Sequence, residues 1–177
     1  MQGRKWLRGL ALAGVLAALA GCDKPMPVGA FGGTSPAFDP VTFWTGHARS
    51  WGVVENRGGA PTAIITTDCT GVADGPDGLT MHQTLTQDGK TTSRDWHMRR
   101  VSPGHFVATA NDMAGEADGE AAGRAFHWTW RWKTGGVAGT VVMSQWMYLL
   151  DDGSLLNRTT VSKLGVTVAE VSEVFRK

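Results

Sequence analysis

The feature that most constrains the fold is a series of short β-like runs separated by turn signals, which continues from Trp51 to the C-terminus. Asp-Gly and Gly-Gly pairs between alternating runs are strong hairpin signals. Consecutive hairpins predict an antiparallel up-and-down meander, and closure into a barrel removes its unpaired edges. The sequence therefore predicts an all-β, antiparallel up-and-down barrel of about 8–10 strands. Nine strand-like runs cover residues 51–56, 62–70, 79–86, 91–101, 105–110, 124–133, 139–150, 154–163 and 167–176.

The N-terminal segment has the pattern of a secretory signal. Residues 1–8 carry three basic side chains and no acidic one, and residues 9–21 are uncharged. Thirteen residues in a helix span about 20 Å, which is short of a hydrocarbon core about 30 Å thick. The segment ends Leu19-Ala20-Gly21-Cys22, which resembles the lipobox of bacterial lipoproteins. We therefore expect residues 1–21 to be a lipoprotein signal peptide and Cys22 to carry the lipid; the alternative is an ordinary signal with an incidental Cys.

The residues after Cys22 predict a location and a tether. Asp23 resembles the signal that keeps some lipoproteins in the inner membrane, so we expect anchoring at the periplasmic face of the cell envelope, with the inner membrane favoured. Residues 22–38 are rich in Pro and Gly and predict a flexible, lipidated tether. Asp39 as N-cap and Pro40 at the first helical position predict a helical turn over residues 40–45. The barrel is then expected over residues 39–177.

Charge and motif content exclude several classes of function. Of the 17 Lys and Arg residues, 3 lie in residues 1–21, which leaves 14 against 16 acidic residues and no block of like charge. Nucleic acid is therefore not an expected partner. The sequence contains no CxxC, HExxH, GxSxG, Walker A or Rossmann motif, so it predicts no metal, no cofactor and no enzyme. If Cys22 is acylated, Cys69 is alone and is expected to be a small buried side chain.

An aromatic stripe is the clearest local pattern. In residues 124–133, aromatic side chains alternate with polar ones, so they fall on one face of a strand. Two interpretations stay open: a packed barrel core, or a cavity lined by Trp and Met that accepts a lipid-like ligand. Buried indole N–H groups need acceptors, which indicates polar atoms or water inside. The candidate lining residues are Trp96, Met98, Phe126, Trp128, Trp130, Trp132, Trp146 and Tyr148, with Met81, Met143 and Met147 as further candidates.

Polar side chains offer two weaker hypotheses. Arg99, Asn157, Arg158 and Lys163 either form cross-strand pairs or make a charged mouth that holds a ligand headgroup, since Arg suits carboxylate and phosphate. An enzyme acting on lipids through Asp95, His97 or His127 has no catalytic spacing to support it.

Several segments together resemble a family of short proteobacterial lipoproteins known only as a domain of unknown function. They are residues 43–47 (FWTGH), 50–53 (SWGV), 94–100 (RDWHMRR), 119–123, 126–130 (FHWTW), 146–153 (WMYLLDDG), 156–158 (LNR) and 162–165 (SKLG). The resemblance covers residues 39–176 and implies a calycin-like, that is lipocalin-type, barrel. It brings no catalytic residues, and it implies a lipid ligand or a lipid-modifying enzyme as partner, because members are often encoded near such enzymes.

Two functions follow from these observations. The first is a membrane-anchored binding protein, expected to be a monomer, whose barrel holds a small apolar or lipid-like molecule such as a fatty acid. The second is an accessory or structural lipoprotein that docks a periplasmic or membrane partner and has a filled barrel. A cavity inside the barrel favours the first function, and a packed interior favours the second.

Overall fold

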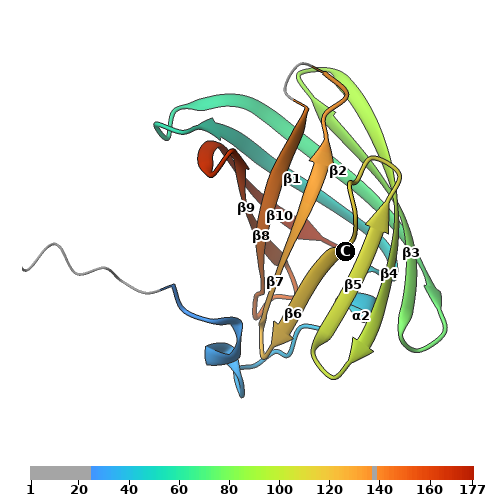
Figure 1. Cartoon of the computed structure of the whole chain (residues 1–177). Coiled ribbons are helices and arrows are strands. Elements are labelled where there is room, and N and C mark those ends of the chain that lie inside the picture. The colour runs from blue at the N-terminus through green and yellow to red at the C-terminus, as the bar shows by residue number, and fades with distance from the viewer. Residues whose placement is uncertain (1–24, 137–138) are drawn as a thin grey trace, which may run out of the picture.

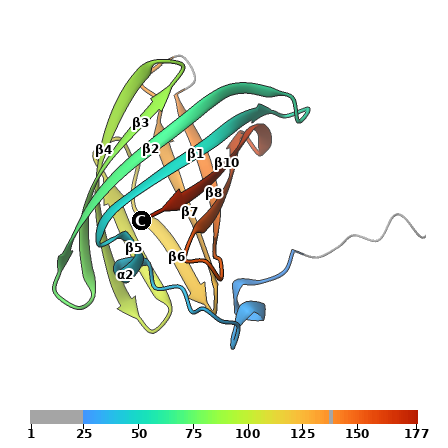
Figure 2. The same ribbon diagram turned by 180° about the vertical axis from the view of Figure 1, so that it is seen from behind.

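Ten antiparallel strands close into a barrel (Figures 1 and 2). The computed structural model describes residues 25–136 and 139–177, so the predicted signal peptide, Cys22 and Asp23 lie outside the described residues. Each strand pairs with the next, and β1 pairs with β10, which confirms the predicted all-β, up-and-down barrel. The strands are β1 (Gly46–Asn56), β2 (Pro61–Asp74), β3 (Gly78–Gln87), β4 (Lys90–Ser102), β5 (His105–Ala110), β6 (Ala117–Ala122), β7 (Ala125–Lys133), β8 (Thr140–Leu149), β9 (Leu155–Lys163) and β10 (Val166–Arg176).

The hairpin turns use the residues that the sequence indicates. Asp88 and Gly89 connect β3 to β4 with φ angles of 49° and 77°. Positive φ at both central residues defines the type I′ turn, whose twist matches that of the flanking strands. Leu164 and Gly165 connect β9 to β10 in the same way, with φ angles of 51° and 78°.

Strand β6 is a correction to the sequence prediction, which left residues 111–123 without a strand. Its inward positions hold small residues: Ala117, Gly119 and Ala121. A Cβ atom added at Gly119 would lie 2.7 Å from the ring of Phe126 on the neighbouring strand. The aromatic rings of β7 thus occupy the interior in front of β6, and only small side chains fit there.

A short helix, α2 (Pro40–Trp44), closes one end of the barrel, as Figure 1 shows. The side chain of Asp39 accepts a hydrogen bond from the backbone N–H of Thr42, which confirms the predicted cap. The Trp44 ring packs edge-on against Phe175 with centroids 5.0 Å apart. A Cβ added at Gly71 of β2 would overlap the carbonyl oxygen of Trp44, so this glycine allows the helix to seat.

Part of the predicted tether packs against the barrel. The 3-10 helix η1 (Val28–Phe31) contacts β6 and β7, and Val28 is buried. Phe38 is also buried, where its ring contacts Phe43 and Phe126. Residues 28–38 thus dock on the domain instead of forming a free linker, because apolar side chains interrupt the run of Pro and Gly. They attach at the closed end, where Phe38 N–H donates to the carbonyl of Gly123 in the β6–β7 turn.

The cap of α2 predicts a pH-dependent stability. Burial alone raises the pKa of Asp39, but hydrogen bonds from Thr42 and the charge of Arg100 outweigh it and hold the pKa below its ordinary value. A pKa that is lower in the folded state than in the unfolded state stabilises the fold, and the full stabilisation is present at pH values above the unfolded-state pKa of about 4. The stabilisation is lost as the pH falls through the folded-state pKa. Asp39→Asn keeps the cap acceptor but loses the charge, so we expect a loss of about 1 kcal/mol at neutral pH.

That difference between wild type and Asp39→Asn should be smaller at about pH 3 than at neutral pH, because the contribution of the Asp39 charge is lost progressively as the pH falls from about 4 through its lowered folded-state pKa. Urea unfolding at the two pH values measures it. Asp77→Asn is the control, because Asp77 also pairs with Arg100 but is more exposed and caps no helix. A loss for Asp39→Asn that is the same at both pH values would contradict the expectation.

Candidate functional site

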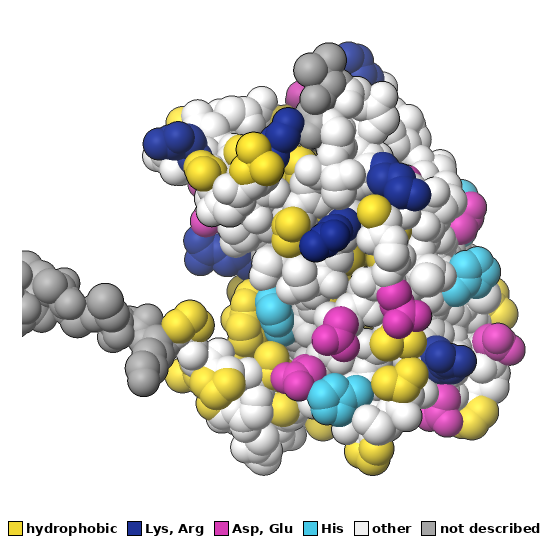
Figure 3. Space-filling model, in the orientation of Figure 1, with side chains coloured by type: hydrophobic (Ala, Val, Ile, Leu, Met, Phe, Trp, Pro, Cys, Tyr) yellow, Lys and Arg dark blue, Asp and Glu magenta, His cyan; other side chains and the backbone are white. Residues whose placement is uncertain are grey.

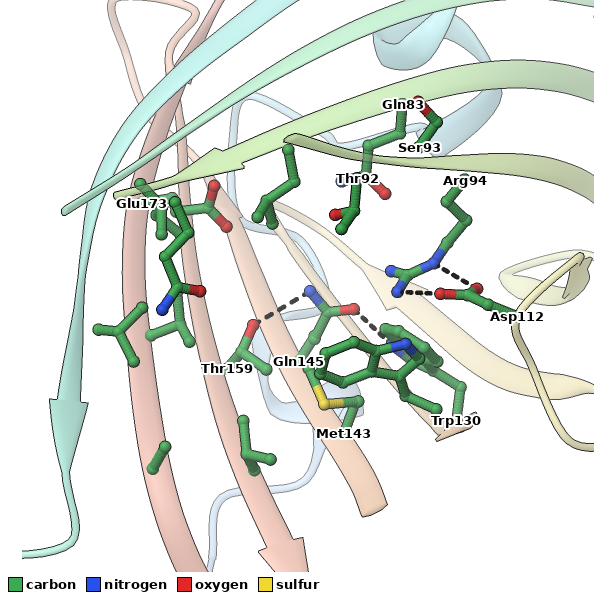
Figure 4. Close-up of a pocket in the computed structure, with 18 residues that line it drawn as sticks. Gln83, Thr92, Ser93, Arg94, Asp112, Trp130, Met143, Gln145, Thr159 and Glu173 are labelled. Carbon is green, nitrogen blue, oxygen red and sulfur yellow. Dashed lines mark hydrogen bonds and ion pairs between the residues drawn. The ribbon is translucent and has the colours of Figure 1, made fainter. Parts of the chain in front are cut away.

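The barrel interior is filled at one end and hollow at the other. Towards α2 the interior is packed, with Phe106, Phe126 and Leu155 fully buried. Beneath the opposite end lies a cavity of about 230 Å³ (Figure 4), just below the size range of typical small-molecule pockets. Its wall is lined by Val54, Ile65, Gln83, Leu85, Gln87, Thr92, Ser93, Arg94, Asp112, Trp130, Trp132, Met143, Gln145, Thr159, Val161, Ala169, Val171 and Glu173.

Two glutamines satisfy the buried indole N–H groups. The side-chain oxygen of Gln145 accepts hydrogen bonds from Trp128 and Trp130 at 2.7 and 2.6 Å. The oxygen of Gln83 accepts one from Trp96 at 2.8 Å. The amide nitrogen of Gln145 donates to Thr159 at 3.0 Å. The prediction that buried tryptophans imply polar atoms inside is therefore confirmed, although the sequence did not single out these glutamines.

An internal ion pair lies on the wall of the cavity. Arg94 donates to both carboxylate oxygens of Asp112, at 2.6 and 2.7 Å. Its guanidinium carbon lies 4.4 Å from the centroid of the Trp130 ring. Asp112 belongs to the connection between β5 and β6, so this pair also ties that connection to β4 (Figure 4).

A second carboxylate lies deeper. Glu173 is 7% exposed and accepts hydrogen bonds from Ser50 at 2.7 Å, Thr67 at 2.8 Å and the amide of Asn157 at 3.0 Å. The side-chain oxygen of Asn157 is buried without a hydrogen-bond partner among the described residues. Both side chains border an inner chamber of about 40 Å³, which shares Gln83, Arg94, Gln145 and Glu173 with the main cavity.

Most of the aromatic stripe lies inside the barrel. Trp130 and Trp132 line the main cavity, and Trp96 and Trp128 line the inner chamber. Met143 lines the main cavity, and Met81 and Met147 line the inner chamber, whereas Met98 and Phe126 belong to the packed core. Both interpretations of the stripe are therefore correct in part. The half of the barrel next to α2 is a packed core, and the other half encloses a cavity lined by Trp and Met.

The placement of Trp146 and Tyr148 in the lining was wrong. Trp146 pairs in register with His127, whose face of β7 points outward, and β8 lines the main cavity with Met143 and Gln145 instead. Both rings pack outside the barrel against Phe31 of η1, with centroid distances of 6.2 and 5.7 Å. The run in β8 is apolar on both faces because η1 covers its outer face, so alternation could not identify the inner one.

The predicted headgroup residues do not gather at one place. Asn157 is buried and points into the inner chamber. Arg158 is on the outer surface, where it pairs with Glu170 at 2.7 Å. Arg99 borders a surface depression across β3, β4 and β5, and Lys163 ends β9 beside its hairpin turn without lining any of the three cavities described. The polar groups that do converge are Gln83, Arg94, Gln145 and Glu173.

The candidates for catalysis lie on the outer surface. Asp95 pairs with His82 on the neighbouring strand at 2.6 Å, and His97 is exposed. His127 lies 2.9 Å from the hydroxyl of Ser144, and burial lowers its pKa despite the nearby Glu120. Neither His127 nor Ser144 lines a described cavity.

The remaining features are possible metal ligands, surface charge, the Cys69 thiol and the length of the helices. The described part of the chain holds no group of His, Cys, Asp and Glu suited to a metal ion. On the face that Figure 3 shows, most Lys and Arg side chains lie over the upper half and most Asp and Glu side chains over the lower half, so this face carries both signs of charge. Cys69 is buried in the core, and burial raises its pKa, so it is the small interior side chain that the sequence predicted. Among the described residues, no helix combines the length and apolarity required to cross a bilayer.

A closed antiparallel barrel with one occluded end and an internal cavity defines the lipocalin-like class. The chain belongs to the family described as protein of unknown function DUF3833, and the match covers residues 16–177. No curated protein matches the sequence.

Two solved structures are similar in fold. One is the S-type phycobiliprotein lyase CPES from Guillardia theta, with a TM-score of 0.53 and 7% sequence identity over 76% of this chain and 87% of the other. The second is Rv2717c from M. tuberculosis, with a TM-score of 0.54 and 15% identity over 81% of this chain and 98% of the other. At these identities the similarity establishes the barrel fold alone.

Proposed function

We propose that the chain is a membrane-anchored lipoprotein whose lipocalin-like barrel binds one small apolar or lipid-like molecule. The observation that carries the proposal is the hollow half of the barrel, with its cavity of about 230 Å³. Half of its lining side chains are apolar and half are polar, which suits an amphipathic molecule. The alternative, an accessory lipoprotein that docks a partner, requires a filled barrel, but only the half of the barrel next to α2 is filled.

The docked N-terminal segment supports an orientation for the anchored protein. Residues 28–38 attach at the closed end of the barrel, near the β6–β7 turn. Only five residues lie between Cys22 and Val28, which allows a reach of about 20 Å at full extension. A lipid on Cys22 would therefore hold the closed end near the bilayer, with the cavity at the opposite end.

Ligand titration tests the proposal. Trp130 and Trp132 line the cavity, so binding of an eight-carbon probe such as octan-1-ol, octylamine or octanoic acid should change tryptophan fluorescence saturably in a non-lipidated chain. Val171→Phe adds a ring inside the cavity and should weaken binding about tenfold or more, because overpacking costs about 1–3 kcal/mol.

Val166→Phe makes the same change on β10 at an exposed position, and it should leave binding unaltered. A flat titration with all three probes would overturn the proposed ligand binding. If the two substitutions weaken probe binding equally, the probe does not bind in the cavity, and the proposed ligand binding is likewise overturned.

A further inference from the structure

The interior of the barrel has an unbalanced negative charge. Arg94 lines both cavities, and Asp112 binds it through both carboxylate oxygens. Glu173 forms no ion pair with any described residue, and its partners Ser50, Thr67 and Asn157 are all neutral donors. A buried charge is unfavourable unless a counter-charge accompanies it. The pocket therefore presents one carboxylate whose counter-charge is not part of the described protein.

An unused acceptor lies beside this carboxylate. The amide of Asn157 donates to one oxygen of Glu173, while its own side-chain oxygen, in a residue 1% exposed, has no donor among the described residues. Two acceptors on adjacent groups can be satisfied together by one group that carries several N–H bonds. An ammonium has three donors and no acceptor, and it carries the missing positive charge.

The walls of the inner chamber suit a cation. The rings of Trp44, Trp96, Trp128 and Phe175 border it together with Glu173. Aromatic faces attract ammonium groups, most strongly when the site is desolvated. With a volume of about 40 Å³ the chamber admits a headgroup but no chain, and the adjoining main cavity offers apolar side chains for the rest of a molecule.

We propose that the inner chamber binds the protonated amino group of a small amphipathic amine, whose apolar part occupies the main cavity. This proposal rests on the proposed binding function and narrows its ligand class. A fatty acid is the less suitable ligand, because its carboxylate would add a second unpaired negative charge near Glu173. A neutral alcohol would supply one donor and no counter-charge.

Binding of three probes with the same chain length tests the proposal. At neutral pH we expect octylamine to bind at least about tenfold more tightly than octan-1-ol, and octanoic acid to bind most weakly. Glu173→Gln should lower the affinity for octylamine about tenfold, to that of octan-1-ol, and leave the alcohol unaffected. The substitution fits the site, because the side-chain oxygen of the new Gln can still accept hydrogen bonds from Ser50 and Thr67. If the amide group of Asn157 rotates by about 180°, its unused oxygen can accept a hydrogen bond from the new amide nitrogen.

The control is Glu170→Gln, which makes the same change on the outer side of β10, where Glu170 pairs with Arg158. It should retain the preference for the amine, and thermal unfolding should show that both variants are folded. If the alcohol or the acid binds as tightly as the amine, or if Glu173→Gln keeps the preference, the amine proposal is wrong while the binding function stands. If none of the probes binds, both proposals fail and the inner chamber holds only water.

Discussion

Replacement of Gln145 by Leu is expected to lower the free energy of unfolding by about 2–6 kcal/mol. The side-chain oxygen of Gln145 accepts from two indole N–H groups, those of Trp128 and Trp130. Leu has a similar size but no acceptor, so both donors are left unsatisfied in the interior, and each costs about 1–3 kcal/mol. Urea unfolding followed by far-UV circular dichroism measures the loss.

Two other glutamines of the cavity wall make matched controls. Gln83 serves a single indole, that of Trp96, so Gln83→Leu should cost about half as much. Gln87 is exposed near the β3–β4 turn, and Gln87→Leu should change stability by less than about 0.5 kcal/mol. A Gln145→Leu protein as stable as the Gln87→Leu protein would contradict the role assigned to the shared acceptor.

The substitution Cys22→Ala is expected to abolish lipid attachment completely. In the proposed lipoprotein the thiol of residue 22 accepts the lipid, and more than one acyl chain is needed for stable anchoring. Mass spectrometry of the wild-type chain from membranes should find residues 1–21 removed and acyl chains on Cys22. The variant lacks the acceptor, so its N-terminal peptide should carry no acyl chain.

Cys69→Ala is the matched control for this experiment, because it removes the other thiol of the chain from a buried position. It should be processed and acylated like the wild type. An unmodified Cys22 in the wild-type chain, or acylation that persists after Cys22→Ala, would overturn the proposed anchor.

The barrel was predictable from the sequence because alternation and hairpin turns recur along almost the whole domain. What escaped prediction was β6, whose sequence ADGEAA has neither large apolar residues nor β-branched ones. Its small inward residues complement the rings of β7, and this complementarity exists only after the two strands are paired. The docking of η1 was missed for a similar reason, since single apolar residues in a Pro- and Gly-rich segment have no period.

The candidate site was predictable only in its aromatic half. The period of β7 placed Trp128, Trp130 and Trp132 on one face, and they do line the interior. The polar half comes from five strands and the connection between β5 and β6. Only the closed barrel brings residues such as Gln83, Arg94 and Glu173 together. Alternation does contain a signal for Glu173, because it lies between Val171 and Phe175 on the inward face of β10. A charged residue at an inward position is unusual and indicates function or pairing.

The pairing of β1 with β10 determines when the hydrogen bonds around the buried Glu173 can form. The hydrogen bond between Ser50 and Glu173 joins residues 123 positions apart, and the bond between Thr67 and Glu173 joins residues 106 apart. Contacts of such long range form late in folding, because the entropy of closing the loop is lost before they are gained. Since β10 is the C-terminal strand of the barrel, these hydrogen bonds cannot form before β10 has been synthesised, and binding competence arises only when all ten strands are available to fold.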